Sequence, residues 1–380
     1  MRRYLTILWL FLLALALGGC ALFPSRPHGE ERLALVQALG IDRELGRVRL
    51  SAVTAADSSR GEGPVRLSGS GSTVLDAAED VSRRAGEEEL FCAHTGYVLL
   101  GEKSAREDVE SVLRFVCRSR EIRMDVPLLI VRGETAETAL LETGDERVGA
   151  SEILHMLDAA APERGGSSFP SVSEIAGALA DGRCALAAAV SCVPASAQKG
   201  EEAPLTLVSA GCAVLCGGKL IAFLDEEDAV GVDLLCGARG VHSFVVTDHA
   251  LGRVTLQTAP GRTELSLARG ADGSVEALEL TISLTASVAE LDGEGDLSDG
   301  DYADELAALL ERELLRRAGR VVRLQSTLGV DFLALRERAA RAARPSERRD
   351  EGFLASVNGA LPLRLSASVR ISHANDVRDG

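Results

Sequence analysis

The chain has 380 residues, of which 46% are hydrophobic and 26% are charged, and this composition is typical of globular proteins rather than disordered ones. Its length has room for two or three domains. The formal net charge of -16 disfavours binding to nucleic acid or to anionic lipid headgroups through the overall electrostatic field. With only 3% aromatic residues, stacking platforms for bases or sugars are also disfavoured.

The N-terminus has the pattern of a bacterial lipoprotein signal peptide. Arg2 and Arg3 form a basic start, residues 5–17 are apolar and uncharged, and residues 17–20 read Leu-Gly-Gly-Cys. The apolar run is shorter than the roughly 20 residues that a membrane-spanning helix needs. The small pair before the cysteine resembles a lipobox, in which the sulfur receives a diacylglyceryl group. We therefore predict a signal peptide over residues 1–19 and a lipid anchor on Cys20, the alternative being an uncleaved anchor helix.

Residues 20–31 contain two prolines and a glycine and are predicted to form a flexible tether behind the lipid. Residues 32–145 are predicted to form an N-terminal α/β domain. Its strands are expected over 33–39, 47–54, 97–100 and 126–131. Its helices are expected after the Ser72-Thr73 cap, after a capping box made by Ser104 and Glu107, and over residues 135–142.

Residues 146–204 are predicted to form a smaller, partly helical middle segment. Ser171 and Glu174 form a capping box there, and residues 184–193 are apolar and typical of a strand. The polar connection 194–204 is the predicted main boundary, and residues 205–380 are predicted to form a C-terminal α+β domain. Its clearest helix is expected over 302–318, with a closing strand over 361–371. The predicted fold class is therefore α+β, multidomain, with mixed β-sheets flanked by helices.

Seven cysteines follow Cys20, and an odd number cannot form a complete disulfide framework within one chain. On one strand, Cys212 and Cys216 would lie roughly 13 Å apart, which is too far for a disulfide. These two cysteines with His242 or His249 match no standard zinc spacing, so we expect buried small side chains there rather than metal ligands.

Motifs for catalysis are absent from the sequence: there is no nucleophile elbow, phosphate loop, His-Glu-x-x-His or Cys-x-x-Cys. The Gly-Ser-Gly-Ser-Thr segment at 69–73 is predicted to be a turn and helix cap, and the acidic run 292–301 fails the EF-hand pattern. His94 lacks an evident nucleophile beside it, and a structural role is expected. We therefore predict no enzymatic activity, no metal, and no cofactor apart from the covalent lipid.

Arg118, Arg120 and Arg123 surround Glu121 at the predicted end of a helix. Cations in this position stabilise the carbonyl end of a helix, so the cluster has an ordinary structural explanation. The alternative is a group of side chains that contacts a partner through salt bridges. We retain the three arginines as candidate partner contacts.

The order of these features resembles the Ger(x)C family, the lipoprotein C subunits of spore germinant receptors. The resemblance is strongest from residue 33 to residue 133 and spans nearly the whole chain. It departs after Asp331, where residues 336–344 are rich in arginine and alanine. The matching segments are residues 17–20, Ala-Leu-Gly-Ile-Asp at 38–42, the helix start at 72–78, residues 90–102, the arginine segment 118–123 with the strand that follows, and residues 211–220.

This resemblance implies a multidomain α/β fold, no known catalytic activity, and a position on the outer face of the inner membrane of the spore. Its implied partners are a membrane A subunit and a permease-like B subunit, which respond together to nutrient germinants. Two alternatives stay open. One is a solute-binding envelope lipoprotein that binds a small nutrient directly, and the other is an envelope hydrolase with His94 as its base.

Overall fold

The computed structural model describes residues 33–55, 63–86, 89–144, 148–161, 169–195, 203–248, 252–292, 300–357, 359 and 361–372. The predicted signal peptide, the lipid site at Cys20, the tether and His249 lie outside the described residues, as does most of the acidic run 292–301. Within the described ranges, no helix combines the length and apolarity that crossing a membrane requires.

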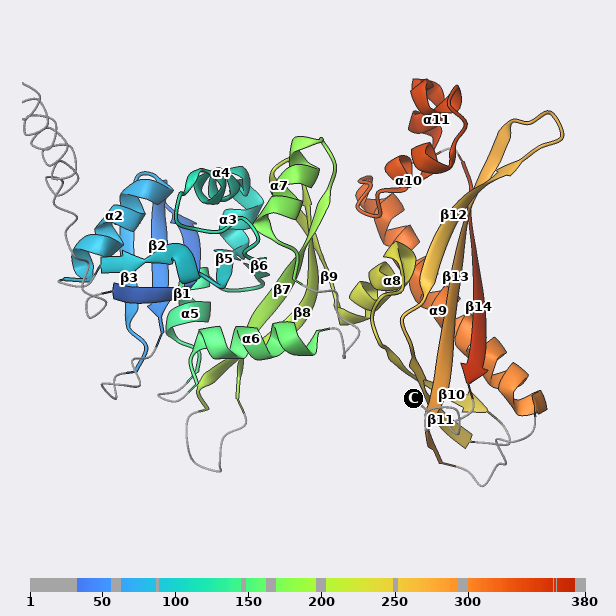
Figure 1. Ribbon diagram of the computed structural model, residues 1–380, viewed down its shortest axis with the longest axis horizontal. Coiled ribbons are helices and arrows are strands. Elements are labelled where there is room, and N and C mark those ends of the chain that lie inside the picture. Colours follow the sequence, from blue (N-terminus) through green and yellow to red (C-terminus); the bar gives the residue numbers. More distant parts are fainter. Residues whose placement is uncertain are drawn as a thin grey trace, which may run out of the picture.

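A nine-stranded mixed sheet organises the first part of the chain (Figure 1). Its order is β3-β2-β1-β5-β6-β7-β8-β9, with β4 paired to β1. The central strands β1, β5, β6 and β7 run parallel, and antiparallel strands lie at both sides. The strands are β1 (Leu33–Glu44), β2 (Arg47–Thr54), β3 (Arg66–Gly71), β4 (Glu89–Phe91), β5 (Tyr97–Gly101), β6 (Leu128–Val131), β7 (Ala185–Pro194), β8 (Leu205–Cys216) and β9 (Lys219–Leu224).

Helices cover both faces of this sheet, which explains why β5 and β6 are apolar at almost every position. One apolar core lies under α2 (Val74–Arg84), α4 (Glu110–Arg118) and α7 (Val172–Ala180). A second core lies on the other face under α5 (Ala136–Leu141) and α6 (Ala150–Ala160). The short α3 (Glu102–Glu107) follows β5 directly.

A five-stranded sheet and a long helix form the second part of the chain (Figure 1). Strand β13 pairs antiparallel with β11 and β12 and parallel with β14, and α9 packs along β14. The elements are α8 (Glu226–Cys236), β10 (Ser243–Asp248), β11 (Gly252–Thr258), β12 (Arg262–Arg269), β13 (Val275–Leu291), α9 (Gly300–Leu328), α10 (Leu335–Ala342), α11 (Glu351–Ser356) and β14 (Leu363–Ser372).

The two parts share structure across residues 204 and 205. Strands β7 and β8 pair antiparallel within the first sheet, although they lie on opposite sides of that position. Helix α8 packs on β8, so Cys212 and Leu224 belong to the core that α9 covers. The predicted domain boundaries remain predictions. The fold class, with mixed sheets flanked by helices, is confirmed.

Several local signals hold in the structure and two are wrong. Gly69, Ser70 and Gly71 were predicted to belong to a turn but form the end of β3, paired with β2, where the two glycines leave room for the backbone of α2. Thr73 caps α2, and the capping box of Ser171 and Glu174 starts α7, as predicted. Ser104 starts no helix: it lies inside α3, is buried, and accepts a hydrogen bond from the Arg43 amide at 2.6 Å. Helix α9 extends ten residues beyond the predicted end at residue 318, because Val321 continues its buried stripe past Gly319.

The structure also corrects the expectation for Cys216. Rather than a buried small side chain on its own, Cys216 at the end of β8 forms a disulfide with Cys184, the residue immediately before the adjacent strand β7. Cys212 is buried and free, as expected. Five of the described cysteines are free: Cys92, Cys117, Cys192, Cys212 and Cys236.

Candidate functional site

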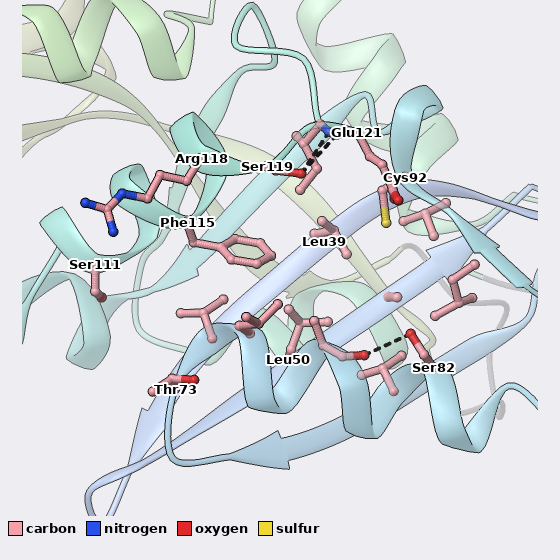
Figure 2. Close-up of a pocket in the computed structure, with 18 of the residues that line it drawn as sticks. Leu39, Leu50, Thr73, Ser82, Cys92, Ser111, Phe115, Arg118, Ser119 and Glu121 are labelled. Atoms are coloured by element: carbon pink, nitrogen blue, oxygen red, sulfur yellow. Dashed lines mark hydrogen bonds between the residues drawn. The ribbon is translucent and has the colours of Figure 1, made fainter.

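A cleft of about 1100 Å³ lies between α2 and α4, above the face of the sheet formed by β1 and β2 (Figure 2). Its floor comes from the sheet, one wall from α2, and the other from α4 and the turn that follows it. The lining residues are Val36, Leu39, Arg43, Leu50, Ala52, Ser72, Thr73, Val74, Leu75, Ala78, Val81, Ser82, Gly86, Leu90, Cys92, Ser111, Arg114, Phe115, Arg118, Ser119, Arg120, Glu121 and Ile122.

The floor of the cleft is apolar and almost inaccessible to water. Leu39 and Leu50 are 3% and 2% exposed, and Val36 is fully buried. Strict alternation along β1 would place Val36 and Leu39 on opposite faces, but the register of β1 and β2 shifts between Val36 and Ala38. Because of this irregularity, both side chains join the core beneath α2 and α4.

Phe115 and Cys92 continue the apolar lining toward the opening. Figure 2 shows the half-buried Phe115 ring pointing from α4 into the gap above Leu39 and Leu50. Burial, with a smaller contribution from the nearby Glu121 carboxylate, raises the pKa of the Cys92 thiol to about 11. The thiol is therefore protonated at neutral pH, and this wall presents no thiolate nucleophile.

The rim of the cleft is cationic, although the whole chain has a net charge of -16. Arg43, Arg114, Arg118 and Arg120 line the cleft, and Glu121 is the single acidic residue in the lining. The Arg43 guanidinium pairs with Asp108 at 3.1 Å, and that of Arg114 lies 3.9 Å from Glu110. Neither Arg118 nor Arg120 forms an ion pair with a described residue.

The structure separates the three arginines that the sequence grouped together. Arg118 ends α4, and its side chain extends away from Leu39 and Leu50 (Figure 2). Arg118 and Arg120 line the cleft, whereas Arg123 does not. The Arg123 guanidinium instead binds the Asp125 carboxylate, with Nε 3.0 Å from Oδ1.

The turn after α4 is held by Ser119, which lies between the two cleft arginines. The Ser119 hydroxyl accepts hydrogen bonds from the amides of Glu121 and Ile122 at 3.2 and 3.1 Å. Ile122 is buried in the core under α4 and anchors the turn from inside. The turn therefore has a defined conformation, and the exposed arginines project from it.

His94 is exposed, at the end of a short 3-10 helix (Cys92–His94), and its ring lies 5.8 Å from that of Phe91. It forms no hydrogen bond with any side chain in the part of the chain that the structure describes. The hydrolase hypothesis required a serine, cysteine or carboxylate within reach of this ring. The geometry therefore gives that hypothesis no support.

A buried His242–Asp233 pair lies in the second part of the chain, and the sequence did not indicate it. Nε2 of His242 lies 2.8 Å from Oδ2 of Asp233, and both side chains are buried. The same carboxylate accepts hydrogen bonds from the amides of Gly240, at 2.9 Å, and Arg239, at 3.3 Å. The pair thus fastens α8 to the loop before β10, which is a structural role.

Two family profiles match the sequence, one in each part of the chain. "Spore germination protein N-terminal domain" covers residues 31–191, and "Spore germination B3/ GerAC like, C-terminal" covers residues 210–372. The chain belongs to the Ger(x)C family of spore germination proteins. Membership gives this Ger(x)C chain a C-subunit role in a spore germinant receptor and associates it with a membrane.

A solved structure supports the fold of this Ger(x)C chain. The chain is similar to the crystal structure of the GerBC protein, with a TM-score of 0.56 and 18% sequence identity. The similarity covers 88% of this chain and 96% of that one. No curated protein matches the sequence. The predicted family is confirmed, and the cleft lies within the N-terminal match.

Proposed function

We propose that this chain is a non-catalytic lipoprotein subunit of a spore nutrient germinant receptor, which assembles with membrane A and B subunits. The observation that carries the proposal is the match of family profiles to both parts of the chain. The proposed location is the outer face of the inner membrane of the spore, with a diacylglyceryl lipid on Cys20. The Leu-Gly-Gly-Cys pattern at residues 17–20 supports that anchor.

A lipid anchor explains how an acidic protein stays beside a membrane that its own charge disfavours. Two acyl chains give stable anchoring, whereas one gives marginal binding. Confinement to the membrane raises the effective concentration of the chain near its partners, so contacts of modest strength suffice for assembly. Among these contacts we include Arg118, Arg120 and Arg123, because all three are exposed, the first at the end of α4 and the other two in the segment that follows.

The anchor is tested on the native chain by mass spectrometry and membrane fractionation. We expect a diacylglyceryl group on residue 20 and recovery of the protein with membranes. The Cys20→Ala variant should lose both, whereas the control Ser25→Ala, five residues further along, should retain both. An unmodified residue 20 together with soluble native protein would refute the anchor but leave the family assignment intact.

The volume of the cleft suggests a second candidate function, in which the subunit binds a small nutrient directly. Its volume of about 1100 Å³ is slightly above the range of about 300–1,000 Å³ that is usual for ligand sites. The polar groups lie at the rim, however, while Leu39 and Leu50 form an apolar floor. An amino acid or sugar needs polar groups that converge on it, so direct nutrient binding remains the alternative. A rise in Tm with a nutrient would support it.

A further inference from the structure

We propose that the cleft between α2 and α4 binds an amphipathic anion with a long acyl chain. The half-buried apolar side chains that line the cleft would contact the chain, and the arginines at the rim would bind the anionic head. This inference goes beyond the receptor role and does not depend on assembly with the A and B subunits.

The apolar lining of the cleft is suited to a hydrocarbon rather than to a polar solute. Val36, Leu39, Leu50 and Ala52 lie at its base but are at most 3% exposed. The surface that a ligand can touch therefore comes from the half-buried Ala78, Leu90 and Cys92 above them. Space bounded by such side chains offers water few hydrogen-bond partners, and apolar cavities of this kind accept apolar ligands. The half-buried Phe115 ring adds an aromatic wall (Figure 2). A polar nutrient would lose its hydration here without replacement hydrogen bonds.

The rim selects for negative charge on the part of the ligand nearest the solvent. Four arginines and one glutamate line the cleft, which reverses the acidic balance of the whole chain. Arg118 and Arg120 have no carboxylate partner among the described residues, so their guanidinium groups are available to a carboxylate or phosphate. The long arginine side chains can reach a head group at the opening while the acyl chain lies beneath it.

The arrangement of the helices favours an acyl chain over a helix of a partner protein. Helices α2 and α4 contact each other, and the buried side chains of both belong to the same core. A helix with its side chains is about 10 Å across, so inserting one would require α2 and α4 to separate. A single methylene chain is narrower and can lie along the existing space.

Photolabelling of the full-length protein in phosphatidylcholine nanodiscs tests the site. The probe is a palmitic acid that carries a diazirine near the end of its chain, and mass spectrometry locates the labelled peptides. We expect labelling within residues 36–52, 74–92 and 111–122. Ala78→Phe, which places a ring in the cleft, should lower this labelling about tenfold or more. The control Ala159→Phe changes an exposed residue of α6, which lies on the opposite face of the sheet, and should leave the labelling unchanged.

Charge-reversal variants of the arginines distinguish ligand binding from the proposed contact with partner subunits. The double variant Arg118→Glu, Arg120→Glu should lower labelling roughly fivefold, whereas Arg123→Glu should not, because Arg123 does not line the cleft. Competition then defines the head group: palmitate and palmitoyl lysophosphatidylglycerol are compared with uncharged methyl palmitate. Preference for palmitate would indicate a free fatty acid, and preference for the lysolipid a membrane lipid. Octanoate should compete at least a hundredfold less well, since each methylene contributes up to about fourfold.

Three results would overturn the proposal. The label could be spread over peptides outside the cleft, the Ala78→Phe variant could be labelled as strongly as wild type, or methyl palmitate could compete as well as palmitate. If Ala78→Phe does not fold, as judged by circular dichroism, Leu75→Glu replaces it. Leu75 lines the cleft but is 61% exposed, so its substitution should preserve the fold and still lower labelling. Unchanged labelling of a folded Leu75→Glu variant would equally overturn the proposal.

Discussion

Asp42 connects the end of β1 to the start of α5, and its substitution gives a quantitative test of the fold. Its Oδ1 accepts a hydrogen bond from the Ala136 amide at 3.0 Å, and Oδ2 accepts one from the Glu137 amide at 2.8 Å. Burial raises the pKa of Asp42, against the lowering effect of these two amides. The first turn of α5 has no other acceptor for these two donors among the described residues.

In the Asp42→Ala variant, two helix amides lose their acceptor. A buried unsatisfied donor costs about 1–3 kcal/mol. The Ala136 amide is fully enclosed, while the half-buried Glu137 amide can regain water. The substitution also removes the cost of burying the Asp42 carboxylate, which offsets part of the loss. We therefore expect a net destabilisation of about 2 kcal/mol. Asp42→Asn keeps one acceptor oxygen and should cost about 1 kcal/mol.

Hydrogen exchange with mass spectrometry provides the assay, because it reports on the α5 peptide separately from the rest of a multidomain chain. The Ala136 and Glu137 amides should exchange faster in Asp42→Ala than in wild type. The control Thr135→Ala removes the hydrogen bonds of the Thr135 hydroxyl with the Thr138 amide and hydroxyl, leaves those of Asp42 in place, and should cost about 1 kcal/mol. A loss below about 0.5 kcal/mol in Asp42→Ala, with α5 exchange unchanged, would refute the reasoning.

Three further predictions concern other parts of the fold. The arginines three and four residues further along lower the pKa of Glu313 to about 2, so its carboxylate stabilises the protein at neutral pH. The advantage of wild type over Glu313→Gln in urea unfolding should be about 1 kcal/mol at pH 7 and disappear as pH falls from 4.5 toward 2. The Cys184–Cys216 disulfide spans 32 residues, so the double alanine variant should lose about 2–4 kcal/mol in the same assay. Gly101→Ala would bring its Cβ against the Asp42 carboxylate and should lower Tm by several degrees.

Two of these predictions have a matched control. Glu305→Gln alters an exposed glutamate of α9 that has no ion pair with a described residue, and it should leave the stability in urea unchanged at pH 7. Gly177→Ala adds a methyl group to α7 where the space is open and should leave Tm unchanged or raise it. The role of Glu313 would be contradicted if both glutamine variants showed the same pH dependence. The steric role of Gly101 would be contradicted if the two alanine variants had the same Tm. The contribution of the disulfide would be contradicted if its variant were as stable as wild type.

The sequence was sufficient where local chemistry determines the structure. The Thr73 cap, the capping box at Ser171 and the apolar runs of β5 and β6 depend on residues close together in the chain. Ser104 showed the same pattern and was misread, because its hydroxyl binds the Arg43 amide, 61 residues earlier. A capping motif therefore predicts a helix start only when no distant backbone group competes for the side chain.

The remaining features depend on contacts between distant segments. The Cys184–Cys216 bond requires the pairing of β7 with β8, which no spacing rule reveals. Asp233 has the sequence pattern of a solvated helix residue until β10 brings His242 beside it. The cleft is likewise set by the separation of α2 and α4 above the sheet. Only its arginine turn was visible in the sequence, and there Arg123 proved to be separate from the cleft.

The central claim is that the chain works as an anchored receptor subunit, and co-purification from spore membranes tests it most directly. Affinity capture of the full-length protein should recover the A and B subunits. Recovery should fall for Cys20→Ala and remain unchanged for Ser25→Ala. Capture of wild type without either subunit would contradict the claim of assembly, and full recovery with Cys20→Ala would contradict the role of the lipid.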